Sequence, residues 1–394
     1  MNMSSGKNAF AAVVRREWRR MTSRRLYFGV CIVLPLFCLF FMSTIFGTGQ
    51  MVNIPVGIVD QDQSATSREI IRTVEAVPTL QVTQTFADPL SARKATQQKE
   101  IYGYLVIPPD FEAKVVNGNN ATLSYYYHYA LLSVGTEVKG AFESVLQELS
   151  MGTVVSAAEA SGISETQIET FLLPVNIQSH PLYNPDLNYS VYLCLPFFFI
   201  LFQIIVLLVT TYVIGIEIKF KTASEWFGCA RLNPVVAVAG KMAPYTLIFI
   251  IMGVLANFVL FHVLHLPYEG VFVPMMLAST VFILATEALG LFLVALFPAI
   301  SIVISVVSMT GSLGATLSGV TFPAPFFFPA IYYLSFLFPV RHFVEIMQSL
   351  LYGNAGFAVY WPHVSVLLLF LLLPLPILPH LKKSILSHKY EDIQ

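Results

Sequence analysis

The feature that most constrains this sequence is a series of apolar runs, each long enough to cross a lipid bilayer. The first, Leu26 to Gly47, has 22 residues and no charged side chain, and about 20 apolar residues suffice to span the hydrocarbon core as a helix. A cleaved signal peptide is the competing interpretation, but the run is too long for one and no small-residue cleavage site follows it. Because backbone groups inside a bilayer must pair internally, such runs predict membrane helices. We expect them at Leu26–Gly47, Val191–Ile216, Met242–Leu264, Val271–Phe297, Ala299–Val320 and Trp361–Leu378.

Lysine and arginine are concentrated in three of the polar segments beside these runs. Seven lie in residues 1–25, four in residues 217–241 and three in residues 382–394, whereas the outer loops apart from one long insertion hold only Arg341. Positively charged loops remain on the cytoplasmic side, so both termini and residues 217–241 are predicted there. Residues 1–25 are expected to form a basic amphipathic helix on the anionic headgroups of membrane lipids.

The long insertion, residues 48–187, has the size of an ordinary domain and a pattern of alternating strands and helices. Since it is entered and left through membrane helices, we expect an extracytoplasmic α/β domain. Asp60, Asp62 and Ser64 are interpreted as a turn and helix cap, because the glycine and closing glutamate of a calcium loop are absent. The expected strands are near Ile54–Val59, Leu80–Phe86, Ile101–Ile107, Leu123–Tyr129 and Val175–Ser179, and the expected helices are near Ala65–Ala76, Leu90–Lys99, Phe111–Val116, Leu131–Ala160 and Glu165–Leu172.

Residues 217–241 form a polar, basic segment between two apolar runs. Ala223 to Leu232 can form a short helix in the plane of the membrane interface, with Trp226 and Phe227 on one side and Glu225 on the other. Asn233-Pro234 is predicted to end this helix, and Gly240 to Pro244 to open the next membrane run. From the residues alone, a docking element and an ordinary basic cytoplasmic loop are equally acceptable interpretations.

Other features concern the membrane interior and its outer surface. Glu287 lies well inside an apolar run, and an intramembrane carboxyl group indicates either a function or a polar contact that fixes helix packing. Gly311, Ala315 and Gly319 recur every four residues and predict a close helix contact, within the chain or between two chains. Residues 321–340 are rich in aromatic residues and proline and favour a re-entrant segment at the outer surface.

Several kinds of chemistry lack the residues they need. The two Gly-Lys pairs, Gly6-Lys7 and Gly240-Lys241, have neither the upstream glycine nor the following hydroxyl residue of a phosphate-binding loop. No supported nucleophile, metal-ligand or cofactor motif is present. We therefore expect a non-catalytic protein with no cofactor and no metal.

The pattern of residues resembles that of a known family. The first cytoplasmic loop, with Glu217, Thr222, Trp226, Gly240-Lys241 and Pro244-Tyr245, is similar to that of type-2 permeases of ATP-binding-cassette (ABC) exporters. The phrases Pro55–Ser64 and Tyr104–Phe111 resemble the external domain of the same family. Leu317-Ser318-Gly319 and Arg341-His342-Phe343 resemble its closing segment.

The resemblance implies six transmembrane helices with an inserted α/β extracytoplasmic domain, in a bacterial inner membrane. It also implies a separate ATP-binding subunit as partner, a second permease copy or paralogue, a periplasmic adaptor, and no nucleic acid. The expected cargo is an exported amphipathic or hydrophobic molecule, such as a drug-like molecule, lipid or glycan. The residues implied in coupling to the ATPase are Glu217, Lys221, Thr222, Glu225, Trp226, Phe227 and Lys241.

These expectations divide the chain into five parts. The parts are a cytoplasmic helix (1–25), the first membrane helix (26–47), the extracytoplasmic domain (48–187), a five-helix membrane domain (188–381) and a cytoplasmic tail (382–394). A membrane-anchored receptor is the first alternative, although no cytoplasmic segment is long enough for an output domain. A secondary transporter without an ATPase is the second, but it would usually show inverted repeats and more buried charge.

Overall fold

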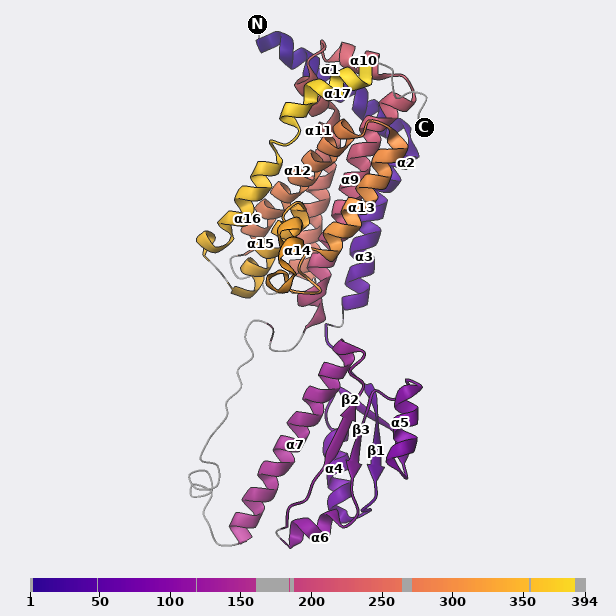
Figure 1. Cartoon of the computed structure of the whole chain (residues 1–394), viewed down its shortest axis with the longest axis vertical. Coiled ribbons are helices and arrows are strands. Elements are labelled where there is room, and N and C mark those ends of the chain that lie inside the picture. Colours follow the sequence, from indigo (N-terminus) through magenta and orange to yellow (C-terminus); the bar gives the residue numbers. More distant parts are fainter. Residues whose placement is uncertain are drawn as a thin grey trace. The chain divides into compact units, whose positions relative to one another are not determined.

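The computed structural model describes residues 3–47, 49–117, 119–160, 184, 188–263, 271–353 and 356–386. The chain divides into two compact units. Unit 1 comprises residues 1–49 and 181–394, and unit 2 comprises residues 50–180. Unit 1 is helical and unit 2 contains a β-sheet (Figure 1).

Unit 1 is a bundle of long helices with shorter helices at its ends (Figure 1). The helix α9 lies at its centre, because α3, α12, α13 and α15 all pack against it. The α-helices are α1 (Met3–Ser23), α2 (Arg25–Phe28), α3 (Leu34–Phe46), α9 (Leu195–Lys219), α10 (Ala223–Cys229), α11 (Pro234–Phe258), α12 (Phe272–Leu296), α13 (Ile300–Thr316), α14 (Pro329–Ser335), α15 (Pro339–Gly353), α16 (Phe357–Phe370) and α17 (Leu378–Leu386). Short π- or 3-10-helical turns are Gly29–Val33, Ser190–Cys194, Val259–Val263, Ala324–Phe326 and Leu375–Ile377.

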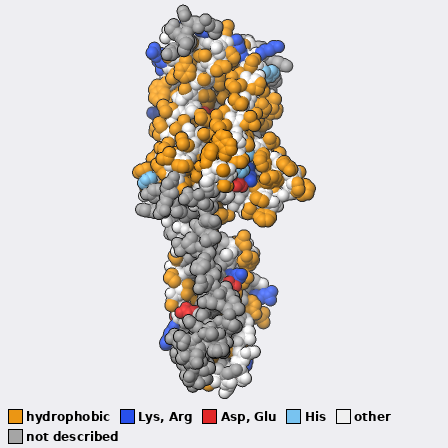
Figure 2. All heavy atoms as spheres, turned by 90° about the vertical axis from the view of Figure 1, so that its left-hand side faces the viewer, with side chains coloured by type: hydrophobic (Ala, Val, Ile, Leu, Met, Phe, Trp, Pro, Cys, Tyr) orange, Lys and Arg blue, Asp and Glu red, His pale blue; other side chains and the backbone are white. Residues whose placement is uncertain are grey.

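Five helical stretches in the described part of the chain are long and apolar enough to cross a membrane. They are Arg25–Phe46, Tyr192–Lys219, Pro234–Val263, Phe272–Leu296 and Phe357–Leu386. The one remaining expected span, Ala299–Val320, corresponds to α13, which is apolar but has only 17 residues. Large apolar side chains such as Phe40 (70% exposed) and Leu277 (64% exposed) face outward. Figure 2 shows hydrophobic side chains over most of the flank of unit 1. Such a surface belongs in lipid rather than in water.

The structure differs from the sequence-based expectation at two helix boundaries, the start of α11 and the end of α13. Asn233-Pro234 begins α11 rather than only ending α10, because the Asn233 side chain accepts hydrogen bonds from the N–H groups of Val235 and Val236. Gly240 therefore lies inside α11. The helix α13 ends at Thr316 instead of Val320. The last span is interrupted after Phe370, as its prolines Pro374, Pro376 and Pro379 predict. The sequence analysis did not predict α15, an amphipathic helix.

Unit 2 contains a four-stranded sheet with the order β2-β1-β3-β4. The strands are β1 (Ile54–Asp60), β2 (Leu80–Phe86), β3 (Gly103–Ile107) and β4 (Ser124–Tyr127), and its helices are α4 (Ala65–Glu75), α5 (Pro89–Gln97), α6 (Phe111–Val116) and α7 (Leu132–Ala160). The first three strands are parallel and β4 is antiparallel to β3. All lie close to their expected positions. The expected helix Glu165–Leu172 and strand Val175–Ser179 lie outside the described residues.

The two faces of this sheet are covered unequally. Apolar residues of α4, α6 and α7 pack on one face, whereas the cluster on the other face contains buried residues from α5 alone among the helices. Gly57 points to the α5 face, where an added Cβ would lie 2.7 Å from the Phe86 ring. The carboxylate of Asp60 accepts hydrogen bonds from Asp62 N and Ser67 Oγ, and Ser64 caps α4. These contacts are those of a turn and cap.

Candidate functional site

The predicted coupling helix is present as α10, a short helix between the long helices α9 and α11. Its ends are tight turns in which Lys221, Arg231 and Leu232 have φ values of 57°, 53° and 59°. Non-glycine residues rarely adopt this left-handed conformation, so the turns hold the backbone in a restricted shape. The helix packs against α1, α9, α11 and α17. It therefore has fixed neighbours on several sides.

One face of α10 is buried in unit 1. The side chains of Ala223, Trp226, Phe227 and Ala230 are buried, with Trp226 and Phe227 fully so. The Trp226 indole N–H donates a hydrogen bond to the carbonyl oxygen of Ala237 in α11, at 3.0 Å. Trp226 and Phe227 thus attach α10 to the bundle, and they are not available as a docking surface.

The opposite face of α10 is exposed. Ser224, Glu225 and Gly228 are exposed on the helix, and Lys221 and Arg231 are exposed in the turns beside it. The residues implied in coupling therefore differ in their exposure. Lys221 and Glu225 lie on the accessible side, Thr222 is partly buried, and Glu217, Trp226, Phe227 and Lys241 are buried.

A buried group of charges lies next to this helix. The Lys241 ammonium group donates to Glu217 Oε1 of α9 and to Glu17 Oε2 of α1, both at 2.7 Å. These three side chains are 0% exposed. The Tyr245 hydroxyl donates to Glu17 Oε1 at 2.9 Å, and Lys241 Nζ lies 5.0 Å from the centre of the Trp226 ring. One lysine of α11 therefore contacts α1, α9 and α10.

Two arginines of α1 complete the cluster. Arg16 donates to both carboxylate oxygens of Glu217, at 2.7 and 3.1 Å, and Arg20 also donates to Glu217. Thr222 donates its hydroxyl hydrogen to Glu217 as well. Burial acts to lower the pKa of Arg16, but the hydrogen bonds to Glu217 and its negative charge act to raise it. Together they outweigh burial, so the pKa of Arg16 stands above its ordinary value. Arg16 is therefore held as a cation.

The charges of this cluster nearly balance. Three cations (Arg16, Arg20 and Lys241) surround two carboxylates, and Glu225 lies 3.9 Å from Arg16 at the exposed edge. Buried charges are tolerated only when they are paired and hydrogen-bonded, and pairs of this kind specify one geometry. No group of three metal ligands occurs among the described residues. The paired charges hold the helices α1, α9 and α11 together.

Sequence reasoning missed the α1 members of the cluster, Arg16, Glu17 and Arg20. It interpreted residues 1–25 as a helix on the membrane surface, but Glu17 is 0% exposed and pairs with a residue 224 positions away. The available signal was one acidic residue inside the basic run RREWRR. A carboxylate there reduces the attraction to anionic lipid and indicates a specific basic partner.

The intramembrane carboxyl group of Glu287 lies on α12 and is buried. The Thr246 hydroxyl group of α11 lies 2.7 Å from Glu287 Oε2 and 3.1 Å from the Met242 carbonyl oxygen. Glu287 Oε1 has no hydrogen-bond partner among the described residues. The contact with Thr246 ties α11 to α12.

The predicted glycine stripe is only partly a helix contact. A Cβ at Gly311 would lie 2.9 Å from Ile204 of α9, so the close approach there is within the chain. Ala315 is half-buried against the core of unit 1. Gly319, in contrast, lies beyond the end of α13 and has φ +89°. Glycine at this position permits a left-handed turn and is not part of a helix face.

The helices of membrane-spanning length and the lipid-like surface define the class as a polytopic α-helical membrane protein. The sequence matches the family model described as "ABC-2 family transporter protein" over residues 25–378. The chain therefore belongs to this family and is an ABC transporter permease, which confirms the resemblance seen in the sequence. It is 23% identical over 353 residues to the "Probable multidrug ABC transporter permease YbhS" of Escherichia coli K12, covering 87% of this chain and 88% of the relative. The protein of the same description from E. coli O157:H7 matches equally.

Proposed function

We propose that this chain is the permease subunit of an exporter whose ATP-binding subunit docks on the exposed face of α10. The observation that carries the proposal is the two-sidedness of α10. One face packs against α1, α9, α11 and α17, with Trp226 hydrogen-bonded to α11, and the other face exposes Ser224, Glu225 and Gly228. Permeases of the ABC family work in general with an ATP-binding subunit, and this chain has no phosphate-binding loop of its own.

The buried cluster gives the proposal its mechanism. A push on α10 would reach α11 through the bond between Trp226 and Ala237, and α9 and α1 through Glu217 and Lys241. Because packed helices move as rigid bodies between discrete arrangements, this push would shift the bundle between inward-open and outward-open states. Two such permeases, as two copies or a copy and a paralogue, would enclose the pathway.

The topology follows from the charge distribution. We place the α1, α10 and α17 end in the cytoplasm, since Lys and Arg gather at that end of unit 1 in Figure 2. With α13 as a sixth, short span, both termini lie on the cytoplasmic side of a bacterial inner membrane. Unit 2 then lies on the periplasmic side, where a periplasmic adaptor could meet it. The YbhS relatives carry the description multidrug, which favours an amphipathic or hydrophobic drug-like cargo over a lipid or glycan.

A bulky substitution on the exposed face tests the docking role. A Cβ at Gly228 meets nothing within 4 Å, so Gly228→Trp fits the free chain but obstructs a partner. The matched control is Gly140→Trp on α7, where a Cβ also meets nothing within 4 Å. The chain is purified from native membranes in mild detergent, and co-purifying P-loop ATPases are identified by mass spectrometry.

We expect the ATPase to accompany the wild-type chain and Gly140→Trp, and to be lost from Gly228→Trp. Glu225→Lys should uncouple ATP turnover from transport, whereas the same charge reversal at the exposed Glu75 of α4 should not. Undiminished ATPase recovery with Gly228→Trp would rule out the α10 surface. Ion-gradient-dependent transport with no ATPase would favour a secondary transporter.

A further inference from the structure

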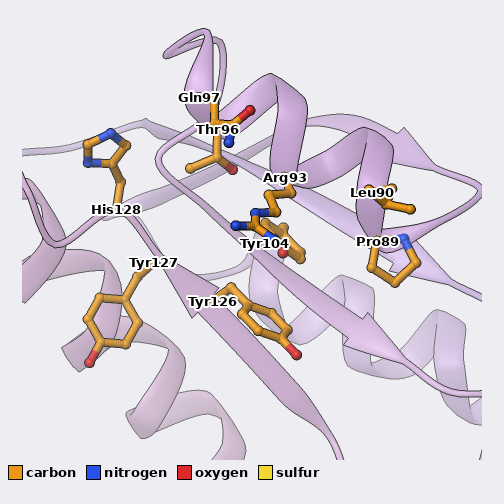
Figure 3. Close-up of a pocket in the computed structure, with 9 residues that line it drawn as sticks. All are labelled: Pro89, Leu90, Arg93, Thr96, Gln97, Tyr104, Tyr126, Tyr127 and His128. Atoms are coloured by element: carbon orange, nitrogen blue, oxygen red, sulfur yellow. The ribbon is translucent and has the colours of Figure 1, made fainter.

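A groove lies on the less-covered face of the unit 2 sheet (Figure 3). It exists because α5 has only nine residues and packs through Ala92 and Ala95. Part of the sheet beside α5, towards the edge strand β4, is left without a helix above it. The cavity volume is about 480 Å³, within the roughly 300–1,000 Å³ of small-molecule sites.

The floor of the groove is aromatic. Tyr104 of β3 and Tyr126 of β4 are directly opposed in the antiparallel register, and their rings stack at 4.8 Å with an interplanar angle of 17°. Tyr126 is 50% exposed, and Leu90 on the α5 wall is 77% exposed. Tyr104 itself is buried, so the exposed Tyr126 ring and the neighbouring Leu90 are the surfaces that offer stacking and apolar contact to a planar ring system.

The polar groups of the groove differ in charge and position. Arg93 of α5 extends toward Tyr104 in Figure 3, and none of the residues lining the groove is acidic. His128 lies at the other end of the groove (Figure 3), where its buried Nδ1 has no hydrogen-bond partner among the described residues. Buried polar nitrogens are normally paired. The groove thus offers one positive charge without a counter-charge in its lining.

We propose that this groove binds a small anion with a flat apolar ring system, such as an aromatic carboxylate. The ring would lie against the exposed Tyr126, which Tyr104 supports by stacking, and the acid group would pair with Arg93. Arginine recognises planar carboxylates through paired N–H donors, so charge and shape select the same class of molecule. The site lies within unit 2 and requires neither ATP nor a second subunit.

The test uses the full chain in lipid nanodiscs and 2-naphthoate as the probe. Binding is measured by equilibrium dialysis with naphthalene fluorescence, and empty nanodiscs are subtracted. The neutral 2-naphthamide tests the need for charge. Arg93→Gln and Tyr126→Ala change exposed residues of the groove, and Arg72→Gln, at an exposed position on α4, is the matched control.

We expect saturable 2-naphthoate binding that weakens about tenfold in Arg93→Gln, the effect of one charge-assisted contact, and is unchanged in Arg72→Gln. Tyr126→Ala should weaken both probes several-fold. Absence of saturable binding, equal binding of the amide, or equal effects of Arg93→Gln and Arg72→Gln would overturn the proposal. Because the assay involves no transport, such a result would leave the permease function untouched.

Discussion

Removal of the Lys241 charge tests whether the buried cluster holds together the end of unit 1 that contains α1 and α10. In Lys241→Met, Glu17 and Glu217 each lose a 2.7 Å charge-assisted hydrogen bond in a place that is 0% exposed. Glu217 keeps Arg16 and Arg20, but Glu17 keeps only the Tyr245 hydroxyl and a 3.8 Å contact with Arg16. Removing one partner from a buried ion pair costs about 3–5 kcal/mol, because the other charge remains buried. We expect a loss of this size in the free energy of unfolding.

The double variant Glu17→Gln/Lys241→Met separates pairing from packing. It removes both charges, and a glutamine can still accept the Tyr245 hydrogen bond, so we expect it to recover all but about 1–2 kcal/mol. Lys139→Met is the control, since its pair with Glu143 is 3.6 Å long with both side chains exposed, and exposed helix pairs contribute only about 0.3–0.5 kcal/mol.

Unfolding of the purified chain by sodium dodecyl sulfate, followed by tryptophan fluorescence, provides the measurement. Trp226 lies 5.0 Å from Lys241 Nζ and reports on the region directly. A Lys241→Met chain within about 1 kcal/mol of wild type would contradict the reasoning, because it would mean that the cluster is solvated. A double variant no more stable than the single one would show that the loss arises from packing and not from an unpaired Glu17.

Two further substitutions address the membrane interior and its outer turn. Gly319→Ala should destabilise the chain by about 1–2 kcal/mol and Gly319→Asn by less, because φ +89° is unfavourable for most residues and asparagine tolerates it better; equal melting temperatures for all three chains would argue against this. Glu287→Gln should retain transport in a reconstituted assay, because the amide can keep the single hydrogen bond with Thr246. Loss of transport without loss of stability would instead assign Glu287 a role in carrying a proton or ion.

Local patterns in the sequence were sufficient for much of unit 2. Leu80–Phe86 and Phe111–Val116 form a strand and a helix with the expected ends, because alternation and helical periodicity report which side of an element is buried. At Asn233-Pro234 the same reasoning gave an incomplete answer. An Asn-Pro pair can end one helix or cap the next, and only the hydrogen bonds of the folded turn show that it caps α11 here.

The membrane class follows from the sequence by itself, because the cost of placing a charged or apolar residue in a bilayer depends mainly on that residue. The proposed cytoplasmic placement of the basic segments rests on the same kind of reasoning. The tertiary structure decided which side of α10 is free. Trp226 and Phe227 read equally well as a docking face or a buried face, and Lys241 as a surface charge or a core one. The Lys241 side chain points inward because it pairs with carboxylates of α1 and α9, and one of these, Glu17, is 224 residues away in the sequence. The energy of a buried charge is set by the partners that surround it in space, and the local sequence does not tell which distant residues those partners are.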